Sequence, residues 1–314
     1  MFPMKLLKRT LLILFLALNI VAAFHAYKFT HFYAPGTTDN RKPEQMNALE
    51  KLKIIFFGVR MSKTVANTTP DTAYIPVNLP TTNGLHLSCW YIPVPDSKGT
   101  VLLFHGYGGN KGPGLSEAAW FRHLGYSTFL TDFRGHGDSE GNTCTVGYKE
   151  ADDVKAAYDY ISKKDNKPII LWGVSMGAAA ILRAIPTYHL QPEKVILECP
   201  FATLTDAVKT RMRAVNLPQT PLSQLLTIWG GLEQGFWGPG YQPAKEGEKL
   251  KMPVLLCWGE HDIRVTRQET NAVFNHLGST QKQLVIFTHS GHQSFCRQEG
   301  PKWKKAISTF LAAK

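Results

Sequence analysis

Trp172-Gly173-Val174-Ser175-Met176-Gly177 follows an apolar run at residues 168–171 and precedes three alanines at residues 178–180. This order predicts a strand, a sharp turn and a helix. In a Gly-x-Ser-x-Gly turn the serine adopts a strained backbone, and the two glycines avoid a clash with the neighbouring strand and helix. The same pattern is compatible with an ordinary turn in a chain that has 26 glycines. The choice depends on whether the chain also supplies a base, an acid and donors for an oxyanion.

Short apolar runs alternate with amphipathic segments over most of the chain. We expect strands at residues 74–79, 85–92, 100–104, 126–131, 168–171, 194–198, 253–258 and 283–287. We expect helices at residues 114–124, 147–162, 176–185, 266–277 and 301–311. The first two strands flank Asn83-Gly84, which predicts an antiparallel hairpin. The fold class is therefore α/β, with a mostly parallel eight-stranded sheet covered by helices on both faces.

Residues 200–252 interrupt this alternation. The segment carries many large apolar side chains among prolines and glycines: Phe201, Leu204, Leu217, Leu222, Leu225, Leu226, Ile228, Trp229, Phe236, Trp237 and Tyr241. Side chains of this kind need a surface to pack on, and a cap inserted over a substrate cleft provides one. The alternative is a surface segment that contains helices but covers no substrate cleft.

The N-terminal segment has the composition of a targeting or anchoring sequence. Basic residues within positions 1–10 precede residues 11–24, which are apolar except for Asn19. We favour an uncleaved membrane anchor over a signal peptide that is cleaved near residues 21–23 and releases a secreted protein. The positive-inside rule places the basic end in the cytoplasm and the rest of the chain on the periplasmic or extracellular side.

Three parts are expected along the chain. Residues 1–27 form the anchor or signal, residues 28–73 form a linker with an amphipathic helix, and residues 74–314 form the α/β domain. The helix of the linker is predicted at residues 43–61, packed on the domain or on the membrane.

Charge narrows the range of partners. The formal net charge is +11, but no Lys/Arg cluster is interleaved with aromatic residues, so a nucleic-acid partner is not expected. An anionic membrane surface is one use of such charge, and a solvated surface is the other. The chain contains no Walker pattern, no complete G-x-G-x-x-G and no H-E-x-x-H, so we expect neither a nucleotide cofactor nor a metal.

The five cysteines are an odd number without C-x-x-C spacing, which argues against a zinc site and against a complete disulfide framework. Cys199 and Cys257 lie in strand-like runs and are expected to be buried thiols. Cys144 and Cys296 lie in predicted loops, and a bridge between them is left open for an exported protein.

Polar residues follow several predicted strands at the point where each strand ends. Ser175 follows the strand at residues 168–171, the sequence Gly259-Glu260-His261-Asp262 follows residues 253–258, and Thr288-His289-Ser290-Gly291-His292 follows residues 283–287. Open α/β sheets bind ligands at these carboxyl ends. A serine, an acid and a histidine thus occur in the order that hydrolases of this architecture use. Glu260 is an alternative acid and His289 an alternative base.

The chain resembles the α/β-hydrolase superfamily, in particular its branch similar to serine aminopeptidases and monoacylglycerol lipases. The resemblance covers residues 74–312. It rests on His105-Gly106, on Asp132-Phe133-Arg134-Gly135-His136-Gly137-Asp138-Ser139, on the serine turn, on Gly259 with Asp262, and on Gly291-His292. It implies a catalytic triad of Ser175, Asp262 and His292, no cofactor, and structural roles for Asp132 and Arg134.

The chemistry explains why these residue types are needed. A serine hydroxyl is too weak an acid to attack a carbonyl unaided, so His292 should take its proton, and Asp262 should fix the tautomer of the histidine. The backbone amides of Met176 and Tyr107 are the expected oxyanion donors. The predicted function is hydrolysis of a small ester or acyl substrate through an acyl-enzyme. The alternatives are a peptidase or amidase with the same triad, and a binding protein without turnover.

Overall fold

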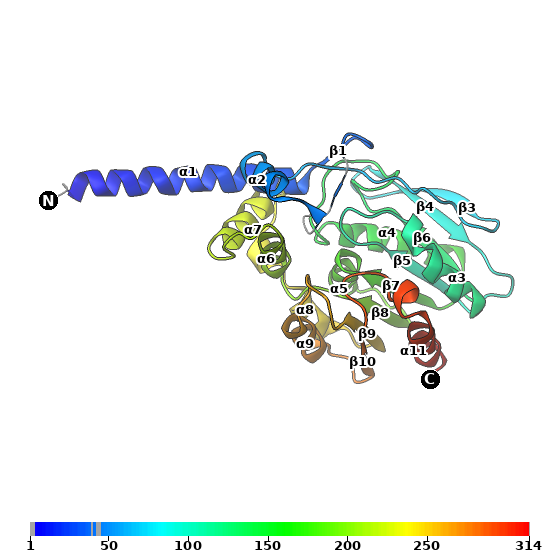
Figure 1. Ribbon diagram of the computed structural model, residues 1–314. Helices are drawn as coiled ribbons and strands as arrows, with labels where there is room; N and C mark the ends of the chain where they lie inside the picture. The colour runs from blue at the N-terminus through cyan, green and yellow to red at the C-terminus, as the bar shows by residue number, and fades with distance from the viewer. Residues whose placement is uncertain (1–3, 39, 42–44, 314) are drawn as a thin grey trace.

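The described residues form one large eight-stranded sheet (Figure 1). The structure, a computed structural model, describes residues 4–38, 40–41 and 45–313. The strands of the large sheet are β3 (Ile75–Pro80), β4 (His86–Ile92), β5 (Thr100–Phe104), β6 (Ser127–Thr131), β7 (Ile169–Val174), β8 (Lys194–Glu198), β9 (Val254–Gly259) and β10 (Lys282–Phe287). Their spatial order is β3-β4-β6-β5-β7-β8-β9-β10, with antiparallel pairing at β3–β4 and β4–β6 and parallel pairing elsewhere. The predicted fold class is confirmed.

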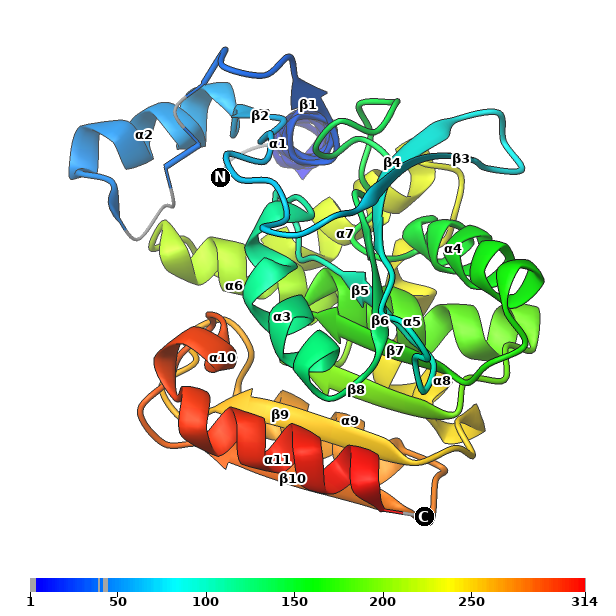
Figure 2. The same cartoon turned by 90° about the vertical axis from the view of Figure 1, so that its right-hand side faces the viewer.

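Helices cover both faces of the sheet (Figure 2). On one face α3 (Leu115–His123) lies beside α11 (Gly300–Ala312), and the ring of Phe121 meets the indole of Trp303 edge-on. The other face carries α4 (Glu150–Lys164), α5 (Met176–Tyr188) and α9 (Arg267–His276). Because both faces are covered, β5 and β8 are buried along their whole length, which explains the apolar runs at residues 101–104 and 195–197.

Most predicted elements lie within three residues of their structural counterparts. The larger difference concerns the helix predicted at residues 43–61, of which residues 43 and 44 lie outside the described residues. The structure has α2 (Ala48–Phe57), which begins after a capping box made by Asn47 and Glu50. Beyond it, β2 (Met61–Ser62) pairs in parallel with β1 (Phe32–Tyr33). The sequence did not predict this pairing because a two-residue strand carries no periodicity.

The predicted cap is present but smaller than residues 200–252. Between β8 and β9 the chain forms α6 (Leu204–Ala214) and α7 (Leu222–Glu233), which lie beyond the edge of the sheet, next to the N-terminal helix (Figure 1). The rest of the segment contains α8 (Pro243–Glu246), which packs against α5 and α9 on a face of the sheet. The cap therefore consists of α6 and α7, whereas α8 belongs to the body of the domain.

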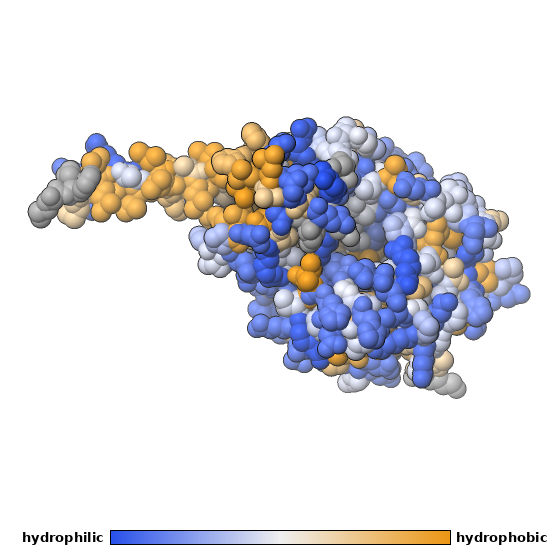
Figure 3. Space-filling view, viewed as in Figure 1, coloured by the Kyte–Doolittle hydropathy of each residue, from blue (hydrophilic) through white to orange (hydrophobic). Residues whose placement is uncertain are grey.

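The first described helix, α1 (Met4–Thr30), is long and apolar enough to cross a membrane. Its 27 residues span about 40 Å at a rise of 1.5 Å per residue, compared with a hydrocarbon core of about 30 Å. It projects from the domain with its apolar side chains exposed (Figures 1 and 3). Buried positions in α1 are confined to Ala22, Ala26 and Thr30 near its C-terminal end. The part boundaries at residues 27 and 73 stay predictions, and α1 continues past the first of them.

Two buried ion pairs hold the loop after β6. The carboxylate of Asp132 accepts hydrogen bonds from the backbone amides of Lys111 (2.6 Å) and Asp138 (3.0 Å) and pairs with the Lys111 ammonium group. Arg134 contacts both carboxylate oxygens of Asp153 through its amide and its guanidinium group at 2.7–2.9 Å. Because an unpaired buried charge is costly, these pairs fix the path of the loop. Asp132 and Arg134 have the structural contacts that the resemblance implied.

All five cysteines are free thiols in the described part of the chain. Cys199 and Cys257 are buried, as predicted. Cys144 is also buried, and its sulfur lies 3.4 Å from the sulfur of Met176. The bridge between Cys144 and Cys296 that the sequence left open is not formed.

We expect the substitution Glu198→Gln to change the pH dependence of stability. Burial and the charge of Glu117 raise the pKa of Glu198 from 4.5 to about 8. Between these values the folded protein holds a proton that the unfolded chain has released, so the stability of the wild type falls as the pH rises. Glutamine keeps an oxygen acceptor for the indole groups of Trp172 and Trp303, which donate at 3.0 and 2.7 Å.

Thermal unfolding at pH 5 and pH 8.5 measures this effect. The melting temperature should fall less with pH in Glu198→Gln than in the wild type. The exposed Glu260→Gln is the matched control and should behave as the wild type does. Equal pH dependence in Glu198→Gln and the wild type would contradict the assignment of a protonated Glu198.

Candidate active site

Ser175 occupies a strained turn between β7 and α5. Its backbone has φ 53° and ψ −112°, a conformation that residues other than glycine rarely adopt. The amide of Ser175 donates a hydrogen bond of 2.7 Å to the carbonyl oxygen of Glu198, the last residue of β8. The turn is thus tied to the neighbouring strand, as expected for a nucleophile elbow.

The two glycines of the elbow are required by close backbone contacts. A Cβ atom on Gly173 would lie 2.6 Å from the carbonyl carbon of Gly177. A Cβ atom on Gly177 would lie 2.3 Å from the carbonyl oxygen of Phe104, at the end of β5. Both distances are too short for a side chain, so the helix after the serine approaches both β7 and β5 only because these positions are glycine. The interpretation of the motif as an ordinary turn is wrong.

Asp262 and His292 come together at the ends of β9 and β10. Nδ1 of His292 lies 2.8 Å from Oδ2 of Asp262, and the other oxygen of Asp262 accepts the amides of Arg264 (2.7 Å) and Val265 (2.9 Å). Burial of Asp262 favours the neutral acid, but the hydrogen bonds from His292 and the two amides outweigh it and hold the pKa of Asp262 below its usual range. An ionised Asp262 keeps the proton of neutral His292 on Nδ1 and leaves Nε2 as an acceptor.

The alternative acid, Glu260, and the alternative base, His289, are more exposed than Asp262 and His292. The side chains of Glu260 and His289 are exposed to solvent, whereas Asp262 is buried and His292 is half-buried. Glu299 holds the histidine loop in place by accepting the amide of His289 (2.9 Å) and the hydroxyl of Ser290 (2.8 Å). The geometry therefore favours the pair that the resemblance implied.

The end of β8 connects the elbow to this pair. Glu198 accepts the amide of Ser175, and the next residue, Cys199, has its sulfur in one cluster with the Asp262 carboxylate and the His292 ring, all within 4.8 Å. Sequence reasoning predicted that Cys199 is buried but not that it lies here. Burial raises the pKa of Cys199 well above its usual range, and a neutral thiol is a poor metal ligand. The other two groups of the cluster, the Asp262 carboxylate and the His292 ring, are already hydrogen-bonded to each other.

The loop after β5 passes beside the serine. A Cβ atom on Gly106 would lie 3.5 Å from Cβ of Ser175, so Tyr107 follows directly after the point of contact. In the described part of the chain neither the amide of Tyr107 nor that of Met176 donates a backbone hydrogen bond. Neither amide is therefore used by a backbone acceptor, which is compatible with the role in an oxyanion hole that the sequence analysis expects.

His105 and His136 beside this loop are held neutral. Burial lowers the pKa of each to about 4. Nε2 of His105 accepts the amide of Phe133 at 3.1 Å, which leaves Nδ1 to donate to the carbonyl oxygen of Gly106 at 2.7 Å. These histidines support the loop.

Sequence reasoning missed a contact of Tyr107 with the N-terminal helix. The ring of Tyr107 stacks on Phe29 with centroids 4.7 Å apart, and its hydroxyl donates a 2.6 Å hydrogen bond to the carbonyl oxygen of Phe29. The only sequence signal was aromatic character beyond the apolar run, which does not identify a partner 78 residues away.

An eight-stranded, mostly parallel sheet with a serine elbow on its central strand defines the class of α/β hydrolases. Comparison with known proteins identifies the family. A family model described as "Serine aminopeptidase, S33" matches residues 95–229. The protein YfhR of Salmonella typhimurium is 31% identical over 73% of this chain and 78% of YfhR. The chain belongs to this family of α/β hydrolases.

Two further proteins are informative. The lysophosphatidylserine lipase ABHD12 of Danio rerio is 31% identical and aligns with 71% of this chain and 61% of ABHD12. Among solved structures, the esterase Pf2001 of Pyrococcus furiosus superposes with a TM-score of 0.68 at 24% identity, covering 79% of this chain and 95% of the esterase. At this identity the structural match shows the fold alone.

The elbow makes a specific prediction for Gly177→Ala. The added methyl group would meet the backbone of β5, which cannot move without disturbing the sheet, so we expect a loss of stability of about 1–3 kcal/mol. Gly300→Ala is the matched control because no atom lies within 4 Å of the position of its added Cβ. Denaturant unfolding of both variants measures the difference, and equal stabilities would contradict the close approach.

Proposed function

We propose that this chain is a serine hydrolase that cleaves a carboxylic ester through an acyl-enzyme intermediate. The observation that carries the proposal is the Asp262–His292 hydrogen bond at the same sheet edge as the strained Ser175 turn. The order and spacing of these residues along the chain match those expected for hydrolases of this fold.

The proposed reaction uses these groups in sequence. Nε2 of His292 takes the hydroxyl proton as Oγ of Ser175 attacks the ester carbonyl, while Asp262 stabilises the imidazolium that forms. The amides of Met176 and Tyr107 bind the oxyanion, and each such donor is worth about 3–4 kcal/mol of transition-state stabilisation. His292 then gives its proton to the leaving alcohol. A water molecule, deprotonated by His292, attacks the acyl-enzyme and releases the carboxylic acid.

Mutations separate this triad from its alternatives. Ser175→Ala should abolish hydrolysis of p-nitrophenyl esters and labelling by a fluorophosphonate. Asp262→Asn should lower kcat by about 10³–10⁴-fold because His292 loses the acceptor that fixes its tautomer. The controls Glu260→Gln and His289→Gln should retain wild-type kcat. A large loss in either control, with activity kept in Asp262→Asn, would overturn the assignment.

Two names bear on whether the scissile bond is an ester or an amide. ABHD12 is named a lipase, which favours an ester, whereas the family description names aminopeptidases. The two bond types use the same triad and oxyanion donors. A matched pair of substrates, an aminoacyl ester and the corresponding aminoacyl amide, measures the preference as a ratio of kcat/KM. A ratio in favour of the amide would replace the esterase by a peptidase.

We further propose that α1 is an uncleaved membrane anchor and that the domain lies on the periplasmic or extracellular side. The helix runs without a break through residues 21–23, where cleavage would occur, and its last turns are buried against the domain. Cleavage there would remove Asn19, whose oxygen accepts the indole N–H of Trp229 in α7 at 3.0 Å. A cleaved and secreted protein is the alternative.

Three measurements on the expressed protein test the anchor. The intact mass should include residues 1–27, the protein should remain in membranes after an alkaline carbonate wash, and protease added to intact spheroplasts should digest the α/β domain. A soluble chain that begins near residue 24 would show cleavage. A protease-resistant domain would show the opposite orientation.

A further inference from the structure

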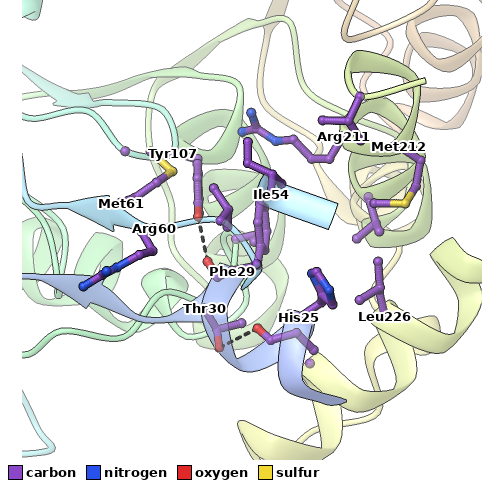
Figure 4. Close-up of a pocket in the computed structure, with 18 of the residues that line it drawn as sticks. His25, Phe29, Thr30, Ile54, Arg60, Met61, Tyr107, Arg211, Met212 and Leu226 are labelled. Atoms are coloured by element: carbon purple, nitrogen blue, oxygen red, sulfur yellow. Dashed lines mark hydrogen bonds between the residues drawn. The ribbon is translucent and has the colours of Figure 1, made fainter. Parts of the chain in front are cut away.

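A large cavity lies between the N-terminal segment and the cap. Its volume is about 820 Å³, within the roughly 300–1,000 Å³ of sites that hold one small molecule. Figure 4 shows Phe29 of α1, Ile54 of α2, Met212 of α6 and Leu226 of α7 around it. At one end it reaches Tyr107, whose amide is a proposed oxyanion donor. The cavity therefore reaches the loop that passes beside Ser175, although Ser175, Asp262 and His292 do not line it.

Helix α1 forms one wall of this cavity. Ala26 and Phe29 line it, and Ala26 packs close to α7, where a Cβ atom on Gly230 would lie 3.8 Å from the Ala26 methyl group. The stacking of Phe29 on Tyr107 attaches the same wall to the loop that carries the proposed oxyanion donor. The helix that the sequence identifies as an anchor thus forms a wall of the cavity and contacts the loop of the proposed oxyanion donor.

Helix α2 has one face toward the cavity and one toward the surroundings. Ile54 lines the cavity, whereas Leu49, Leu52 and Phe56 are 62%, 47% and 66% exposed. The apolar surface of α1 continues around α2 (Figure 3). Exposed leucine and phenylalanine side chains on a helix next to a membrane span are typical of contact with lipid. The cavity therefore lies directly behind the surface that faces the bilayer.

Basic groups dominate the charged lining. Arg211 and Arg264 line the end near the reaction site, where the guanidinium carbon of Arg211 lies 5.1 Å from the centroid of the Tyr107 ring and Arg264 follows Asp262 by two residues. Lys53 and Arg60 also line the cavity. The carboxylate of Glu50 is paired with Arg41 at 2.6 Å. Because Arg211 and Arg264 make further contacts within the protein, the surface left for a ligand is mainly the apolar one.

We propose that α1, α2, α6 and α7 bind the acyl chain of a single-chain ester taken from the bilayer. The inference rests on the proposed esterase function and adds the substrate class and the part of the chain that selects it. The acyl chain lies between Ile54 and Leu226. The anchor is then a wall of the substrate site as well as a tether.

Chain-length preference of the full-length protein in nanodiscs tests the acyl site. Chain-length preference is measured as the ratio of kcat/KM for p-nitrophenyl laurate to kcat/KM for p-nitrophenyl acetate. Ile54→Trp should lower this ratio at least ten-fold because the indole fills the cavity. Leu52→Trp places the same side chain on the outer face of α2 and should keep the wild-type ratio. Equal ratios in Ile54→Trp and the wild type would overturn the proposal.

Binding without turnover distinguishes this proposal from the proposed function. In full-length Ser175→Ala, a palmitoyl lysophosphatidate with a diazirine at the end of its chain should cross-link to the α6 peptide that contains Met212, and Ile54→Trp should remove the cross-link. Loss of ester hydrolysis in the wild type with this cross-link intact would refute the esterase alone. Cross-links confined to the outer faces of α1 and α2 would refute the acyl site alone.

Discussion

The strained conformation of Ser175 is the constraint on which the arrangement of the site depends. A residue at φ 53° persists only where its surroundings hold it, and here the hydrogen bond to Glu198 and the close approach of Gly177 to β5 do so. Both contacts come from strands on either side of β7. The central strands must therefore be in register before Ser175 can adopt this conformation. The buried ion pairs after β6 fix the position of the adjoining loop.

Much of the fold and the candidate site followed from local patterns. The elbow glycines, the strand ends at Asp262 and His292 and the alternation of elements are encoded within short windows, so they can be predicted from one sequence. The extent of the cap could not, because α8 has only four residues, too few to show a periodic pattern, and its packing on α5 and α9 is seen only in the structure. Long-range contacts such as Phe29–Tyr107 also leave no periodic signal.

The hydropathy of the N-terminal helix indicates a membrane span but gives no sign of its packing on α7. By composition α1 is a membrane span, and most of its side chains are exposed. Its buried positions, Ala22, Ala26 and Thr30, are small residues spaced by four, which lie on one face of a helix. Small residues allow close helix packing, and α7 offers Gly230 at the facing surface, where an added Cβ would lie 3.8 Å from Ala26 and 3.9 Å from Thr30. That spacing was visible in the sequence, but only the structure supplies the partner helix.

Contact between α1 and the loop after β5 has a consequence for catalysis. Because the hydroxyl of Tyr107 bonds to the last turns of α1, the backbone at Tyr107 is positioned from two sides, by β5 and by the anchor. A hydrolase that collects an apolar substrate from a bilayer must keep the scissile carbonyl at a fixed depth relative to the membrane. In the proposed membrane-anchored hydrolase, attachment of the Tyr107 loop to α1 would set that depth through one rigid element, whereas a flexible linker would leave it variable.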